Sequence, residues 1–130
     1  MLIALAFALM LASPPAAPED SFSARVLRGR MVEAGPGGAA YQKALWQQIN
    51  DPAAVALKSC LDRHAPADKS PFTVVANVLP DGKPAQVQAR PATPVADCFA
   101  DWLGTNTLPP PPALATEPVY PIEIDVSIVP

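Results

Sequence analysis

Proline is the residue that most constrains this chain. Eighteen of its 130 residues are proline, and each one fixes its own φ and removes a backbone donor, so helices and ladders are interrupted wherever it falls inside them. We therefore expect many short elements and few long ones. Half of the residues are hydrophobic, which supplies one buried core for a chain of this length and excludes a disordered acidic or basic tail.

The first residues form an apolar run, from Leu2 to Ala12, followed by small residues and prolines. Such a run rises only about 16 Å as a helix, short of the roughly 30 Å hydrocarbon core. It is therefore typical of a secretory signal peptide over residues 1–17, although no Lys or Arg precedes it. An uncleaved anchor and an ordinary buried N-terminus are the alternatives. We expect a periplasmic or secreted bacterial protein with no membrane insertion after removal of the signal.

Export changes the interpretation of the two cysteines, Cys60 and Cys98. An even count in an oxidising compartment predicts one disulfide. Closing the loop between them restricts the unfolded chain by roughly 4 kcal/mol. That is a large share of the total stability of about 5–15 kcal/mol expected for a domain of this size.

The first half of the chain predicts helices. Residues 21–33 fit a strand or a short helix, and residues 18–40 as a whole are interpreted as an N-terminal segment ending in a Gly/Pro linker. Beyond it we expect one α+β domain over residues 41–130. It begins with a helix up to Asn50, and Asp51 with Pro52 then caps a second helix that ends before Pro66. The second helix carries its apolar residues and Cys60 on one stripe.

The second half predicts a hairpin, a helix and a last strand. Two alternating strands, near residues 71–79 and 85–90, flank an Asp-Gly turn at Pro80–Lys83. A helix from Pro94 to Leu103 follows, with Thr93 as its N-cap and Gly104 closing it in the left-handed conformation. Cys98 and Trp102 lie on its apolar stripe and are expected in the core. Residues 108–113 run as extended polyproline before a strand over residues 120–129.

Several kinds of chemistry are excluded or disfavoured. The only local basic group is Arg25, Arg28 and Arg30, and every charge after Arg90 is acidic, so we expect no nucleic-acid partner. Cys60 and His64 are spaced four apart on one helix face, as a nucleophilic dyad would be, but their neighbours are apolar. With Cys98 they make only three ligands of the four that structural zinc takes. We expect no metal, no cofactor and no catalytic residues.

The order from Phe72 onward, with the segments VVANVLPDGKPAQVQA, VADCFADWL and LPPPP, resembles the C-terminal domain of TonB and its periplasmic relatives. The resemblance covers about half of the chain. It implies a three-stranded antiparallel sheet in ββαβ order with one packed helix, preceded here by added helices. The sequence departs from the family in lacking the long periplasm-crossing spacer, in having a signal in place of a membrane anchor, and in its cysteine pair. Energy transduction to outer-membrane receptors is therefore not expected.

The fold implied by the resemblance has helices on one face of a short sheet, which leaves an edge that can recruit an extended peptide as an added strand. The residues of the candidate edge are Tyr120, Ile122, Glu123, Ile124, Asp125 and Val126. Pro121 and the acidic residues beside it are equally suited to prevent such pairing. The function predicted is that of a non-catalytic, exported module that binds a protein or peptide of the cell envelope. A periplasmic inhibitor or immunity-type protein is the first alternative, and a small hydrolase is the second.

Overall fold

The computed structural model describes residues 21–129. The expected signal peptide, residues 1–17, lies outside this range. The elements are α1 (Phe22–Ala34), α2 (Gly38–Arg63), β1 (Phe72–Val78), β2 (Pro84–Arg90), α3 (Pro94–Gly104) and β3 (Tyr120–Val126). The strands form one antiparallel sheet in the order β2-β1-β3, and the predicted α+β class is confirmed. Within residues 21–129 no helix combines the length and the apolarity needed to cross a membrane.

The hairpin of β1 and β2 forms around the predicted Asp-Gly turn. Gly82 has φ +91°, a conformation that a residue with a Cβ adopts only at a cost, and Leu79 N–H donates to Lys83 C=O across the turn at 2.9 Å. The register then shifts between Val75 and Asn77. Gln86 in β2, with φ 51°, supplies the extra residue of this bulge.

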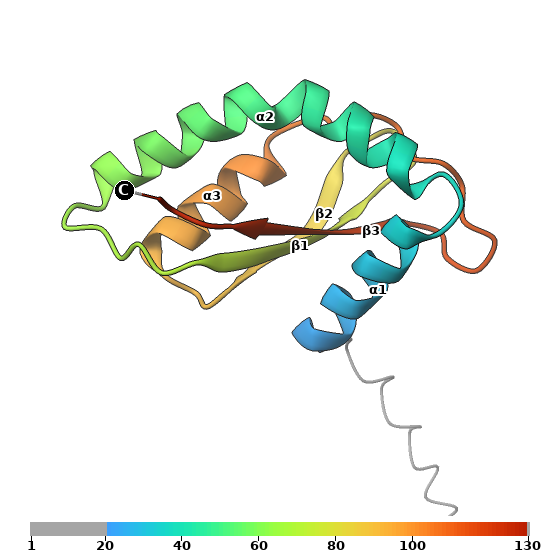
Figure 1. The fold of residues 1–130 in the computed structure, drawn as a ribbon, viewed down its shortest axis with the longest axis horizontal. Helices are drawn as coiled ribbons and strands as arrows, with labels where there is room; N and C mark the ends of the chain where they lie inside the picture. Colours follow the sequence, from blue (N-terminus) through green and yellow to red (C-terminus); the bar gives the residue numbers. More distant parts are fainter. Residues whose placement is uncertain (1–20, 130) are drawn as a thin grey trace, which may run out of the picture.

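Helices cover both faces of the sheet (Figure 1). α2 and α3 pack on the face that carries Val74, Ala76 and Ile122, which belong to the main apolar cluster. α1 lies against the opposite face, mainly under β3, where Arg25 Nη1 donates to Gln88 Oε1 of β2 at 2.9 Å. The expectation of helices on one face is therefore corrected, because Val75 also has to be buried and only 1% of its surface is exposed.

α1 resolves the ambiguity of residues 21–33 in favour of a helix. The Ser21 side chain accepts from Ala24 N–H and caps it, and a helix satisfies its own backbone groups where no strand partner is available. α1 packs on β3 and α2 begins at Gly38. Residues 22–40, interpreted from composition as a segment and linker, thus lie in helices and the turn that joins them.

α2 is one helix of 26 residues that contains Pro52, so the expected break at Asp51 is wrong. Proline removes one backbone hydrogen bond and crowds the preceding turn. Against this cost, a continuous helix keeps one apolar stripe on the core from end to end. The buried members of the stripe are Tyr41, Leu45, Ile49, Ala53 and Cys60. Interrupting the helix at residue 51 would turn one half of the stripe away from the core.

α3 begins as predicted and ends differently. Thr93 accepts from Ala96 N–H at 3.0 Å, with Pro94 in the first turn. Gly104 is the last helical residue and is not left-handed. The end of the helix is capped by polar groups, because the Thr105 hydroxyl and the Asn106 amide both donate to the Trp102 carbonyl at 2.7 Å.

The proline-rich segment after α3 has no regular secondary structure between Leu108 and Ala113, and three hydrogen bonds fix its course. Leu108 N–H donates to Gly82 C=O at 2.8 Å, Gln48 Nε2 to Thr107 C=O at 2.6 Å, and Tyr41 Oη to Pro109 C=O at 2.9 Å. The segment thereby links the β1–β2 turn to α2 before the chain returns as β3.

We expect Gly29→Val to lower the free energy of unfolding by about 1–3 kcal/mol, the cost of overpacking a well-packed site. A Cβ built at Gly29 lies 3.1 Å from both Glu123 N and Ile122 C, so α1 approaches the backbone of β3 too closely for a side chain. Urea unfolding measures the effect. Ala34→Val, at an exposed position of the same helix, is the control and should lose only about 0.5 kcal/mol of helix propensity. Equal losses in the two variants would contradict close packing at Gly29.

We expect Tyr41→Phe to lower the stability at neutral pH by about 1 kcal/mol through loss of the bond to Pro109. Burial, with a smaller contribution from the charge of Tyr120, raises the pKa of Tyr41 from 10.0 to about 12. Because the folded pKa lies above the unfolded value, this stabilisation is complete below pH 10 and is lost as the pH rises through 12. Unfolding followed between pH 10 and pH 12 should therefore show a shallower decline for Tyr41→Phe than for the natural chain.

Tyr120→Phe is the matched control for the neutral-pH measurement. The Tyr120 ring lies 4.7 Å from that of Tyr41, yet its hydroxyl is buried with no hydrogen-bond partner among residues 21–129. We expect its removal to change the stability at neutral pH by less than about 0.5 kcal/mol. A loss as large as that of Tyr41→Phe would show that the bond to Pro109 is not the source of the difference.

Candidate functional site: a half-open sheet edge and a disulfide groove

β3 is an edge strand. The hairpin of β1 and β2 determines which of its backbone N–H and C=O groups point toward β1 and which point away from the sheet. Leu79 N–H points toward β2, where it meets Lys83. Backbone groups of successive residues alternate in direction along a strand, so Val78 and every second residue before it point toward β3. Their partners, beginning with Tyr120 opposite Val78, point back toward β1. The residues of β3 whose backbone groups point away from the sheet are therefore Pro121, Glu123 and Asp125.

The first half of this outer edge is closed. Pro121 is buried and has no N–H to offer, which is a usual way of ending edge pairing. The next outward N–H belongs to Glu123, and Gly29 of α1 lies against it. From Asp125 onward the edge is open, since Asp125, Ser127 and Val129 are exposed.

The six predicted edge residues thus fall into two groups. Three of them, Tyr120, Ile122 and Ile124, are core residues that are 2–3% exposed. Asp125 is exposed and Val126 is half-buried. Glu123 turns toward α1, where its side chain is 7% exposed and Arg30 Nε lies 3.4 Å from its Oε1. The structure brings all six onto one strand but presents only its C-terminal end.

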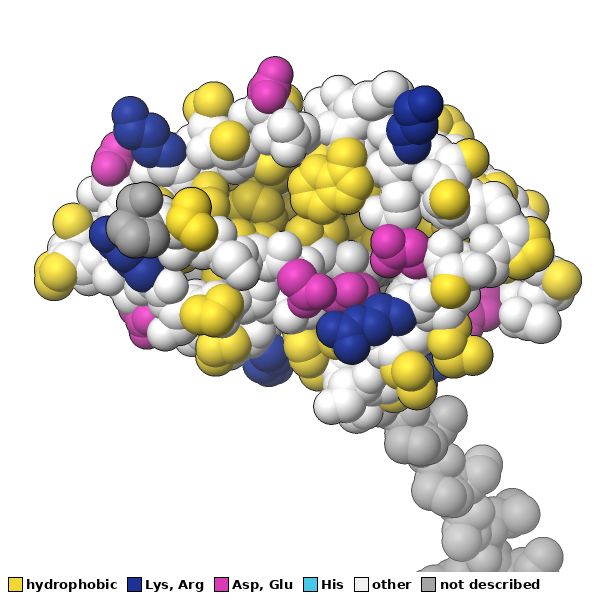
Figure 2. Space-filling view, viewed as in Figure 1, with side chains coloured by type: hydrophobic (Ala, Val, Ile, Leu, Met, Phe, Trp, Pro, Cys, Tyr) yellow, Lys and Arg dark blue, Asp and Glu magenta, His cyan; other side chains and the backbone are white. Residues whose placement is uncertain are grey.

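The surface beside the edge is apolar on one side and charged on the other. Figure 2 shows apolar side chains in a hollow below α2, with acidic side chains and a basic group beneath them. Arg30 Nη2 lies 3.8 Å from Asp125 Oδ2 as well as contacting Glu123. Burial, followed by the charge of Asp125, raises the pKa of the Glu123 carboxyl, and Arg30 opposes this shift. On the charged side, the exposed cation Arg30 is therefore shared by two carboxylates, those of Glu123 and Asp125.

The predicted disulfide joins Cys60 of α2 to Cys98 of α3. Cys60 has no exposed surface, whereas Cys98 is half-buried and does not point fully into the core as the helical stripe predicts. The reason is its place in the contact between the two helices, where Arg63 Nη2 donates to Cys98 Sγ at 3.2 Å and to Cys60 Sγ at 3.9 Å. With both cysteines bonded, the Cys60–His64 dyad is not available, and His64 is exposed.

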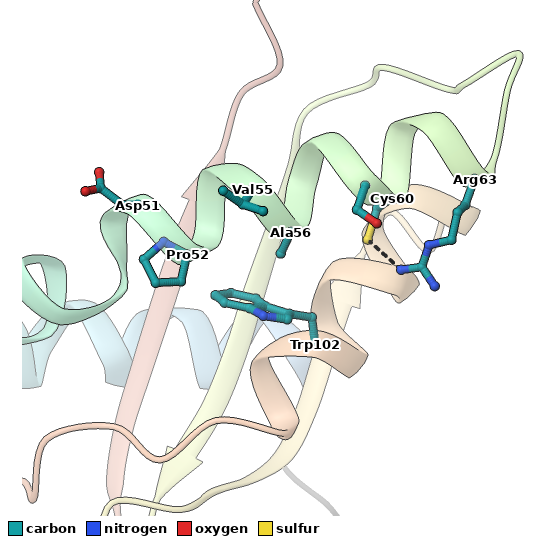
Figure 3. Close-up of a pocket in the computed structure, with 8 residues that line it drawn as sticks. Asp51, Pro52, Val55, Ala56, Cys60, Arg63 and Trp102 are labelled. Atoms are coloured by element: carbon teal, nitrogen blue, oxygen red, sulfur yellow. Dashed lines mark hydrogen bonds between the residues drawn. The ribbon is translucent and has the colours of Figure 1, made fainter.

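Two shallow grooves of about 550 Å³ each meet at Trp102 and Arg63. One is lined by α2 residues that include Pro52, Val55 and Cys60, and in Figure 3 the indole of Trp102 reaches from α3 toward Pro52. The other is lined by the following residues of α3 and its surroundings: His64, Pro94, Asp97, Cys98, Asp101 and Thr105. Trp102 was expected in the core and is instead a half-buried groove residue.

A third groove, of about 580 Å³, separates α1 from residues 114–117. Leu27 and Met31, spaced four apart, line it and are 60% and 66% exposed. Arg28 Nε and Glu117 Oε1, 3.0 Å apart, bridge its two walls. Sequence reasoning missed this groove because residues 21–33 had no assigned structure, and only a helical assignment would have placed Leu27 and Met31 on one face.

No group of three His, Cys, Asp or Glu side chains in the described part of the chain is arranged to hold a metal ion. The arrangement found here consists of surfaces: a half-open edge, two grooves at a disulfide and an apolar groove beside α1. Comparisons of the chain with family models, with curated proteins and with solved structures return no match.

Proposed function

We propose that this chain is a non-catalytic, exported module of the bacterial cell envelope that binds an extended segment of another protein. The observation that carries the proposal is the open end of β3, an edge strand, where Asp125, Ser127 and Val129 are exposed residues. Free N–H and C=O groups at a sheet edge are a template for an added strand. The resemblance to the TonB C-terminal domain supports the same use of the fold.

The two sides of the open edge favour a particular kind of peptide. Side chains of an added strand would alternate between the two faces of the sheet. Those on the α2 side would meet the partly buried apolar residues Leu57, Val126 and Ile128. Those on the α1 side would meet Glu123 and Asp125, for which Arg30 is the one ion-pair partner within residues 21–129. A segment that alternates apolar and basic residues fits both.

The open edge is short, which bounds the strength of binding. Asp125 and Ser127 together offer at most four backbone hydrogen bonds, and each contributes only about 0.5–1.5 kcal/mol net. The proposal is therefore a reversible, moderate-affinity contact.

An inhibitor or immunity-type protein is the second candidate, and the groove beside α1 favours it. Leu27 and Met31 present apolar surface across the groove from residues 114–117. Exposed apolar patches of this kind mark protein interfaces. A partner bound there would dock on the surface of α1 without adding a strand to the sheet.

We expect Ser127→Pro to lower capture of the partner from a periplasmic extract by the immobilised chain about two- to tenfold, the effect of losing one backbone hydrogen bond. The substitution removes the N–H of residue 127, and because this residue follows β3, the pairing of β3 with β1 is retained. Ser127→Ala, which keeps the N–H, should capture the partner as the natural chain does. The bound proteins are measured by quantitative mass spectrometry.

Leu27→Asp separates the two candidate functions. Strand addition predicts that this variant, unlike Ser127→Pro, captures the partner as the natural chain does. The opposite pattern, with capture lost in Leu27→Asp and kept in Ser127→Pro, would replace the proposal by the inhibitor-type function.

A further inference from the structure

We propose that Cys98 Sγ is a site of thiol–disulfide exchange with a dithiol protein, and that Arg63 activates it. The site is the groove of about 550 Å³ that contains Cys98, Arg63 and Trp102. This inference is independent of the peptide-binding function, because it rests on a different surface and a different chemistry.

The two sulfurs differ in access, although each cysteine lines one of the two grooves. Cys60 has no exposed surface, whereas Cys98 is only half-buried in its groove. An incoming thiolate attacks one sulfur along the axis of the bond and expels the other. The burial of Cys60 therefore makes Cys98 the point of attack and Cys60 the leaving group.

Arg63 supplies the charge that such an attack needs. Its Nη2 lies 3.2 Å from Cys98 Sγ and 3.9 Å from Cys60 Sγ, and within residues 21–129 these sulfurs are the only groups with which its guanidinium makes a hydrogen bond or ion pair. A nearby arginine lowers the pKa of a thiol, and a leaving thiol of lower pKa departs faster. The same cation attracts the incoming thiolate. Asp97 and Asp101, which line the groove, act in the opposite direction.

The exchange balances without any further reactant. A thiolate of the dithiol protein bonds to Cys98 Sγ, the Cys60–Cys98 bond breaks, and its electron pair goes to Cys60 Sγ beside Arg63. The second thiol of the dithiol then loses its proton and attacks its own sulfur in the mixed disulfide, which expels the Cys98 thiolate. The dithiol ends as a disulfide, and the cysteine pair has gained two electrons and two protons.

The groove also provides surface for the protein that carries the dithiol. Trp102 lies between the two grooves and lines both, and Val55 on the α2 side is 71% exposed. An aromatic residue beside exposed apolar surface is typical of a contact site. Figure 3 shows Arg63 and Trp102 on either side of Cys60, so a chain lying in the grooves passes over the bond.

The first test maps the attacked sulfur in the natural chain, with reduced glutathione as the probe. Oxidised protein is mixed with glutathione, quenched with acid after partial reaction, digested and analysed by mass spectrometry. The expected result is glutathione on the peptide that contains Cys98. Glutathione on the peptide that contains Cys60 would overturn the proposal. This measurement needs no variant and does not depend on whether a substituted chain folds.

The second test measures the role of Arg63, with dithiothreitol as the probe. Arg63→Gln should lower the second-order rate constant of reduction about three- to tenfold, and Arg63→Lys should recover part of the loss. Lys58→Gln, which removes an exposed cation from the same helix outside the groove, should react within about twofold of the natural chain, as expected for a distant, screened charge. An Arg63→Gln rate equal to that of the natural chain would overturn the activating role.

Discussion

The burial of β1 on both faces is the constraint on which the rest of the structure depends. Val74 and Val75 are neighbours that point to opposite faces, and each is 1% exposed. A sheet of three strands can bury both faces of its middle strand only if helices cover it on both sides. α2 and α3 cover one face, and α1 has to cover the other. The close approach of Gly29 to β3 follows from this requirement.

With both faces covered, the edges are the remaining places where backbone groups can meet a partner. The bulge at Gln86 interrupts the regular ladder in β2. Pro84 of β2 and Pro121 of β3 keep their pairing with β1 but have no N–H for a strand outside the sheet. Such features protect edge strands from adventitious pairing. In β3 this protection ends at Asp125, and neither proline nor α1 opposes an added strand from there to the end of the described residues. The same prolines that limit the length of each element also decide which part of the edge stays open.

The sequence predicts the elements better than it predicts their arrangement. The hairpin, α3 and the Cys60–Cys98 bond follow from local signals: strand alternation, Asp-Gly, Thr93 as a cap and an even cysteine count. The continuity of α2 through Pro52 does not, because the local cost of proline is outweighed by packing that only the tertiary structure shows. The position of α1 also depends on tertiary packing, because the sequence around Val75 does not indicate which helix covers this residue. The sequence predicts the candidate edge residues of β3. The alternation of apolar and polar residues in β3 does not indicate that Gly29 of α1 closes the first half of this edge.

The disulfide and the open edge are joined by one line of packing. Cys98 precedes Phe99 in α3, and the Phe99 ring packs edge-on against Phe72 with centroids 5.8 Å apart. Phe72 in turn pairs with Val126, which follows Asp125, the first residue of the open edge. On the α2 side, Cys60 lies between Leu57 and Leu61, which pack against the same apolar cluster as Val126. Because cores are close-packed, these contacts form a continuous packing path from the bond that fixes α2 to α3 to the apolar side of the edge.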